Sequence, residues 1–306
     1  QNEKSFLYSN IFVLQLKKGL QYNQSNFFIK LLLRLVNLKI YFLGNWYLNN
    51  FNFFHFNKQY DINDFISAVN EKYSAIVVPE HLMDVLTNKA KYDFIKVEIE
   101  EDMIFDVDKN WLNFNDYLDC LKTKYRKKIN TINQKSKNVV IKSLNDSEFI
   151  LYKKQLQSLF DQVVNDNKFS GPQFNVDTLL ELNKRKYLSL YGYFENNHLI
   201  AFSSYLTYND NLVSYFVGFD KTINKMKSIY PKILIETIKI AIEGKYNKII
   251  FGRTANEFKS NFGSVPIKSN IYINFKNKFV HLIYKEILKN HAIKIWEQRS
   301  PYKTQM

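Results

Sequence analysis

Three ionisable side chains lie close together in residues 251–263, FGRTANEFKSNFG. This segment overlaps the end of the short apolar run KIIFGR, which predicts a strand. Ligands of open α/β sheets bind at the carboxyl ends of strands. In that position Arg253 and Lys259 could bind a phosphate of a donor or stabilise a developing oxyanion. Thr254, next to Arg253, is a further candidate for substrate binding.

Two carboxylates are candidates for removing a proton from an attacking amine. Glu257 lies between Arg253 and Lys259, and burial would increase its basicity. The structural alternative is an ion pair between Glu257 and these cations, and a water chain could take the proton instead. Asp220 ends the predicted strand 212–220 and is the rival base. Its structural alternative is the cap of a helix or turn.

The stretch DKTINKMKSIYP, residues 220–231, connects this strand to a predicted helix over 230–246. Lys225 and Lys227 in it could hold phosphates as point charges, and a basic surface loop is the alternative. Tyr230 could protonate a leaving thiolate. In a chain with 21 Tyr, an aromatic side chain that simply packs is the alternative.

The formal net charge of +14 suggests an anionic partner, such as nucleic acid, a membrane surface or a phosphorylated substrate. A lysine-rich solvated surface is the alternative, because the lysines are spread along the chain. The densest basic cluster is KTKYRKK, residues 122–128. Arg126 in this cluster is a candidate for binding an anionic substrate, and a solvated helix face is its alternative.

Several kinds of chemistry lack their usual motifs. Cys120 has no histidine near it in the sequence, and none of the five histidines has metal-ligand spacing. Neither a Gly-x-Ser-x-Gly nucleophile motif nor a phosphate-binding loop is present. We therefore expect no metal and no tightly bound cofactor. One cysteine cannot form a disulfide within the chain, and we see neither a signal peptide nor a long apolar run, which favours the cytoplasm.

The pattern of apolar residues predicts the elements that must position these side chains. From residue 138 the predicted order is strand, two helices, three antiparallel strands, helix, strand, helical turn, strand and helix. A long helix is predicted over 111–135, before this series, and Asp146 is expected to cap the helix that ends near residue 166. The order predicts an α/β (α+β) fold with a mixed central sheet flanked by helices, as in a GNAT domain.

The first hundred residues also alternate between strands and helices. Strands are predicted at 11–16 and 74–79, and a helix at 61–72. Residues 27–43 carry a basic helical face and could contact a membrane surface, although a helix packed into the core is the alternative. The end of this segment could already be a strand.

Three stretches resemble the FemAB-like and BioF2-like acyltransferases, which consist of two GNAT-like halves. They are WLNFNDYLDCLKTKYRKK (111–128), YFVGFD (215–220) and FGRTANEFKSNFG (251–263) with its Lys-x-x-Phe-Gly pattern. The resemblance covers roughly residues 105–275. It implies a GNAT-like half in residues 1–105, incomplete at its start, and a GNAT-like acyltransferase domain in 106–306. The absence of an initial Met agrees with a missing N-terminal part.

The resemblance also implies a site for the donor. In this fold the strand before the main helix separates from its neighbour, here 212–218 from 248–252. Val217 and Gly218 would hold a pantetheine arm there, and the helix start near Tyr230 would hold a pyrophosphate. The glycine-rich phosphate loop of GNAT enzymes is absent between Asp220 and Pro231, which weakens the case for acetyl-CoA. By resemblance, Arg126 faces a cleft that holds an anionic substrate.

The leading hypothesis is an N-acyltransferase that moves an acyl group from an acyl-CoA or acyl carrier protein thioester to an amine. The amine acceptor would be a small molecule or a lipid or cell-wall precursor, and the inner face of the membrane is a possible location. A second hypothesis is tRNA-dependent aminoacyl transfer to such a precursor. A third is an inactive GNAT-like module that binds nucleic acid or membrane.

Overall fold

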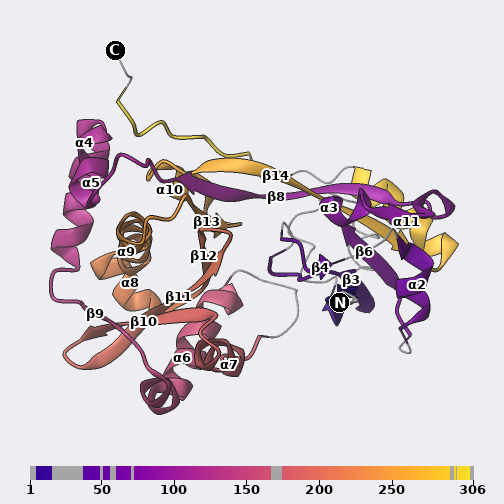
Figure 1. The fold of residues 1–306 in the computed structure, drawn as a ribbon, viewed down its shortest axis with the longest axis horizontal. Coiled ribbons are helices and arrows are strands. Elements are labelled where there is room, and N and C mark those ends of the chain that lie inside the picture. The colour runs from indigo at the N-terminus through magenta and orange to yellow at the C-terminus, as the bar shows by residue number, and fades with distance from the viewer. Residues whose placement is uncertain are drawn as a thin grey trace. The chain divides into compact units, whose positions relative to one another are not determined.

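The computed structural model describes residues 5–15, 37–48, 51–55, 60–69, 72–166, 174–289, 293 and 295–303. These residues form two compact units (Figure 1). Unit 1 takes its described residues from Gln1–Glu100 and Lys268–Ile295. Unit 2 takes its described residues from Glu101–Asn167, Phe174–Ile267 and Trp296–Met306. The chain passes from one unit to the other within β8 (Ile95–Asp106) and again within β14 (Val265–Phe275).

Unit 1 is a mixed sheet with helices on both faces. Its sheet strands, in order across the sheet, are β2 (Ser9–Gln15), β3 (Asn37–Leu43), β6 (Ala75–Pro79) and β14. Only β3 and β6 are parallel in this series. The other elements are β1 (Phe6–Leu7), β4 (Phe54–His55), β5 (Tyr60–Asp61), β7 (Leu86–Thr87), α2 (Ile62–Ser67), α3 (Glu80–Met83), the 3₁₀ turn Lys89–Lys91 and α11 (Lys278–Lys289).

The two faces of this sheet follow from the alternation of side chains along β3. Ile40 and Phe42 belong to the apolar cluster that includes Tyr284 of α11. Tyr41 and Leu43 belong to the cluster that includes Ile62 of α2. Successive side chains of a strand point to opposite faces, so a run of apolar residues such as IYFL predicts a strand covered on both sides.

Unit 2 also has a mixed sheet between two layers of helices. Its strands, in order, are β8, β13 (Lys248–Gly252), β12 (Asn211–Phe219), β11 (His198–Tyr208), β10 (Leu188–Glu195) and β9 (Val140–Ser143). Only the β12–β13 pair is parallel. The helices are α4 (Phe114–Cys120), α5 (Thr123–Lys135), α6 (Asp146–Asp166), α7 (Asp177–Lys184), α8 (Lys221–Lys227), α9 (Ile229–Glu243) and α10 (Asn256–Ser260).

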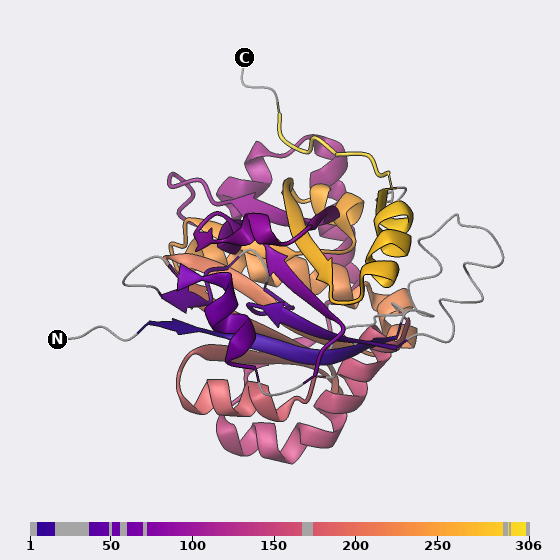
Figure 2. The same cartoon turned by 90° about the vertical axis from the view of Figure 1, so that its right-hand side faces the viewer.

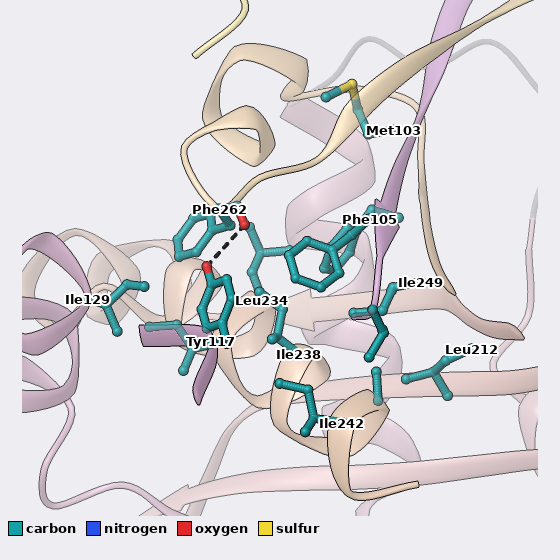
Figure 3. Packing of buried hydrophobic residues seen from close by; sticks show 14 of the residues in the cluster. Met103, Phe105, Tyr117, Ile129, Leu212, Leu234, Ile238, Ile242, Ile249 and Phe262 are labelled. Atoms are coloured by element: carbon teal, nitrogen blue, oxygen red, sulfur yellow. Dashed lines mark hydrogen bonds between the residues drawn. The ribbon is translucent and has the colours of Figure 1, made fainter. Parts of the chain in front are cut away.

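Helices α6 and α7 cover one face of these strands and α9 covers the other (Figure 1). On β11, Phe202 packs in the cluster of α6 and α7, whereas Tyr205 packs in the cluster of α9. Tyr117 lies in the α9 core, where its hydroxyl donates a hydrogen bond of 3.0 Å to the carbonyl of Phe262 (Figure 3). The polar atom of this fully buried ring is thus satisfied.

The structure confirms the predicted mixed sheet flanked by helices and most of the predicted elements. The single helix predicted over 111–135 is wrong, because Leu121 is extended and pairs with Tyr302, which divides the segment into α4 and α5. The predicted cap Asp146 is the first helical residue, and Asn145 accepts the backbone N–H of Glu148 instead. The long strand β8 and the short helix α8 had no predicted counterpart.

The two compact units do not follow the predicted boundary at residue 105. Residues 101–105 belong to unit 2, and residues 268–289 belong to unit 1. The interpretation of 1–105 and 106–306 as two GNAT-like halves stays a prediction. Residues 37–43 form β3, as the strand alternative predicted, and residues 27–36 lie outside the described part of the chain.

Candidate functional site

The parallel strands β12 and β13 pair only where they begin. Their ladder joins Asn211 to Lys248 and ends with Val213 opposite Ile250. In the described part of the chain, β12 continues along β11 to Phe219, whereas β13 continues along β8 to Gly252. Residues 214–219 therefore present a strand edge with no ladder to β13. This is the separation that the resemblance implies for a donor site.

A bulge in the β11–β12 ladder marks the point where the strands separate. The Oγ of Ser204 accepts the backbone N–H of Phe216 at 2.9 Å and donates to the Phe216 carbonyl at 2.8 Å. The register shifts at the same place, between Ser203 and Tyr205. A bulge bends its strand and increases the local twist, and the ladder to β13 ends at Val213, just before the bulge.

Of the two residues predicted to hold a pantetheine arm, Gly218 has a clear packing role. An ideal Cβ at this position would lie 2.7 Å from the backbone nitrogen of Phe160 and 2.8 Å from the carbonyl carbon of Leu159. Any side chain at Gly218 would therefore collide with α6. Val217 packs at the edge of the cluster of buried residues that includes Ile233 of α9.

The stretch after β12 begins with the helix α8, whereas the structural alternative for Lys225 and Lys227 was a basic surface loop. Asp220 caps α8, with its Oδ1 accepting the backbone N–H of Ile223 at 2.9 Å. Lys227 forms an ion pair with Glu195, and Lys225 lies exposed on α8. Asp220 was a candidate base with a helix cap as its structural alternative, and its geometry is that of a helix cap.

The start of α9 has few backbone N–H groups to offer to an anion. The N–H of Tyr230 donates to Oδ1 of Asn224 at 2.8 Å, and that of Lys232 donates to the Ser228 carbonyl at 3.0 Å. Pro231 has no N–H. A pyrophosphate at a helix start needs free N–H groups that point at it. The residues present therefore fit the pyrophosphate of a CoA poorly at this place.

The turn after β13 is strained and is held by a buried lysine. Gly252, Thr254 and Ala255 have φ angles of 68°, 69° and 54°, a region that is unfavourable for the β-branched Thr254. Lys259 is only 3% exposed, and its Nζ donates to the carbonyls of Phe251, Gly252 and Arg253 at 3.0, 2.9 and 2.8 Å. The three hydrogens of the ammonium match these three acceptors, so Lys259 shapes this turn.

Glu257 forms an ion pair, as its structural alternative predicted. The cation in this pair is not one that the sequence had singled out. This cation is the guanidinium of Arg299, in the C-terminal segment. This segment is also attached through Trp296, whose Nε1 donates to Glu101 Oε2 at 2.9 Å, and through Gln298, which donates to the Ser264 carbonyl at 2.9 Å. Arg299 also forms an ion pair of 2.7 Å with Glu297, two residues before it in the run WEQR near the chain end.

An aromatic row borders the separated strands. The ring of Tyr230 lies 5.7 Å from that of Phe219 and 6.0 Å from that of Phe258, which in turn lies 5.6 Å from Phe262. Burial raises the pKa of the Tyr230 hydroxyl well above its usual value. Tyr230 therefore keeps its proton at neutral pH and contributes apolar surface to this region.

The basic cluster lies on α5, beside α10. Arg126 contacts Asp119 at 3.3 Å, whereas the Nζ of Lys128 donates to Asn261 at 3.1 Å and lies 5.1 Å from the ring centre of Phe258. Burial, and then the charges of Lys124 and Arg299, lower the pKa of Lys128. Lys128 is thus the member of the predicted cluster that approaches the segment 251–263.

Two general features complete the description of the candidate site. No cluster of three or more potential metal ligands occurs among the described residues. In the same part of the chain, no helix has both the length and the apolar character that a membrane span requires.

Comparison with known proteins gives a likeness in fold. No model of a known protein family matches the sequence, and no curated protein matches it either. Among solved structures, L-PGS from Bacillus licheniformis is similar with a TM-score of 0.52 at 12% identity, over 82% of this chain and 85% of that one. This match is a likeness in fold, and the predicted mixed sheet flanked by helices is confirmed.

Two further solved structures are similar to this chain with lower TM-scores. FemX has a TM-score of 0.47 at 9% identity, over 81% of this chain and 83% of its own. A GCN5-related N-acetyltransferase from Kribbella flavida has a TM-score of 0.44 at 7% identity, over 90% of this chain and 59% of its own.

Proposed function

We propose that this chain is a transferase that moves an acyl or aminoacyl group to an amine, and that the reaction takes place where β12 and β13 separate. The observation that carries the proposal is the end of their ladder at Val213 and Ile250. Beyond that point residues 214–219 form no ladder with β13, which is where an extended donor arm would lie, and the turn at Arg253 and Thr254 lies at the end of the neighbouring strand.

The chemistry would be direct attack of the amine on the carbonyl carbon of a thioester or ester. The C–N bond forms, the bond to sulfur or oxygen breaks, and the amine loses a proton. Glu257, with Arg299 beside it, is our candidate for receiving this proton, either directly or through water. Asp220 is a weaker candidate because its Oδ1 caps α8. Arg253 is our candidate for binding an anionic part of the donor.

The start of α9 favours a donor delivered by a macromolecular carrier. Tyr230 and Lys232 have their N–H groups bonded within the protein, and Pro231 has none, so this helix start is poorly suited to the pyrophosphate of free acyl-CoA. An acyl carrier protein or an aminoacyl-tRNA does not need a pyrophosphate site here. The net charge of +14 suits either of these acidic carriers, both of which belong to the cytoplasm.

Aminoacyl transfer from tRNA is the second candidate. The cations of residues 122–128 favour it. Burial lowers the pKa of Lys128 most, and the charge of Lys124 lowers it further, so these two cations lie close together. Close cations with few acidic neighbours suit a phosphate backbone. Membership of the FemAB-like group is part of this proposal and rests on the three sequence stretches given above.

A thermal-shift screen of the purified protein tests the proposal. A ligand that binds only the folded state raises the melting temperature, so we expect a shift with an acyl carrier protein thioester or aminoacyl-tRNA and a smaller one with acyl-CoA. Arg253→Ala should abolish the shift. Lys248→Ala, at the other end of β13, is the matched control and should keep it. Shifts that are identical in both variants would contradict the proposed site.

A further inference from the structure

Three large apolar side chains lie exposed on one stripe of α11. This helix is yellow in Figure 2. Phe279, Leu282 and Ile283 are 72%, 63% and 36% exposed. Their spacing of i, i+3 and i+4 places them on one side of the helix. A contiguous exposed apolar stripe on a helix marks an interaction surface more often than isolated exposed residues do.

The opposite side of α11 is firmly packed, so the helix cannot turn this stripe inward. His281 and Tyr284 are buried, and the ring of Tyr284 stacks on that of Phe275 with 4.7 Å between centres. Lys285 is tied to Asp93 by an ion pair of 2.8 Å. The helix is thus fixed in its rotation by contacts within unit 1.

The charges beside the stripe are mainly positive. Residues 276–289 contain four lysines against one glutamate, Glu286. Lys285 pairs with Asp93 and Lys289 pairs with Glu286, which lies on the same side of α11 as the stripe.

The exposed Lys276 and Lys278 remain beside Phe279 at the start of α11. An apolar stripe with lysines beside it is the pattern of a helix that lies on an anionic lipid surface. The long lysine side chains can reach head groups while Phe279 and Leu282 enter the boundary of the acyl chains.

We propose that α11 docks unit 1 on an anionic lipid bilayer through Phe279, Leu282 and Ile283, with Lys276 and Lys278 contacting the head groups. The size of the stripe argues against a second copy of the chain as its occupant. Three side chains, one of them only 36% exposed, offer far less than the area of about 800 Å² that a stable dimer buries on each partner. This proposal does not depend on the proposed transfer reaction.

Vesicle co-sedimentation of the full chain tests the proposal. The vesicles are pure phosphatidylcholine and an equal mixture of phosphatidylcholine and phosphatidylglycerol. We expect binding to the mixed vesicles that weakens with added salt, and at least about tenfold weaker binding of the double variant Phe279→Ser/Leu282→Ser. Lys278→Ala should weaken binding about fivefold.

The matched control is Ile150→Ser/Leu151→Ser on α6, which removes two side chains with exposures of 59% and 72%. This control should bind as the unchanged protein does. The proposal is overturned if the chain does not bind mixed vesicles, if both double variants bind alike, or if pure phosphatidylcholine is bound equally well. Light scattering of the α11 variant adds a last check: loss of a dimer with unchanged vesicle binding would assign the stripe to a second copy and would also overturn it.

Discussion

Replacing Lys259 by Met separates a structural role of this residue from a catalytic one. The substitution keeps an unbranched side chain and removes an ammonium that donates to the carbonyls of Phe251, Gly252 and Arg253. Hydrogen bonds to a charged group contribute at least about 1.5 kcal/mol each. Part of this loss is offset, because the buried ammonium no longer has to be desolvated. We therefore expect Lys259→Met to lower the free energy of unfolding by about 3 kcal/mol.

For a domain of this size, such a loss corresponds to a melting temperature lower by roughly 6–12 °C. The assay is thermal unfolding followed by circular dichroism, with Lys225→Met as the matched control. Lys225 is exposed on α8, so its replacement should change the stability by less than about 0.5 kcal/mol. A Lys259→Met protein that melts with the control but loses transfer activity would refute the structural role and would support direct participation in the reaction.

Three further substitutions test other parts of the structure. Asp220→Ala removes the side-chain cap of α8 and should cost about 1 kcal/mol in urea unfolding, whereas Asp220→Asn should cost less. Gly263→Ala should be strongly destabilising, because φ is +102° and the new Cβ would lie 2.1 Å from the hydroxyl oxygen of Tyr302; a melting temperature equal to that of the unchanged chain would contradict this close approach. Burial raises the pKa of Tyr284 to about 12, from 10.0, so the folded state binds its proton more tightly, and this contribution to stability is present below pH 10 and is lost as the pH rises towards about 12. Tyr284→Phe removes a buried hydroxyl without a hydrogen-bond partner among the described residues, so it should not destabilise at pH 7 and should reduce the alkaline loss measured in unfolding titrations.

The elements that depend on local patterns could be predicted from the sequence. The alternating strands β10, β11 and β12 and the helix α9, with Pro231 in its first turn, carry periodic apolar residues and turn signals. The order of these elements was enough to predict a mixed sheet flanked by helices. The separation of β12 from β13 also followed, but only through the resemblance.

Features that depend on distant partners could not be predicted. The break between α4 and α5 requires Tyr302, which is far along the chain from Leu121. The ion pair of Glu257 requires Arg299, and its sequence neighbours gave no sign of this contact. Lys259 was interpreted as a ligand-binding cation because a lysine after a strand has this use in many sites. Its burial against three carbonyls depends on the strained turn at Thr254, which no local pattern revealed.

The proposed transfer site can be tested most directly by cysteine protection. Cys120 is the only cysteine of the chain, so Cys120→Ser gives a background without thiols. In this background Thr254→Cys places a thiol on the exposed turn after β13, and Ser189→Cys places a control thiol on β10. We predict that an acyl carrier protein thioester or aminoacyl-tRNA slows alkylation of the first thiol and not of the second. Equal alkylation rates of the first thiol with and without every donor tested, or equal protection of both thiols, would contradict a donor site where β12 and β13 separate.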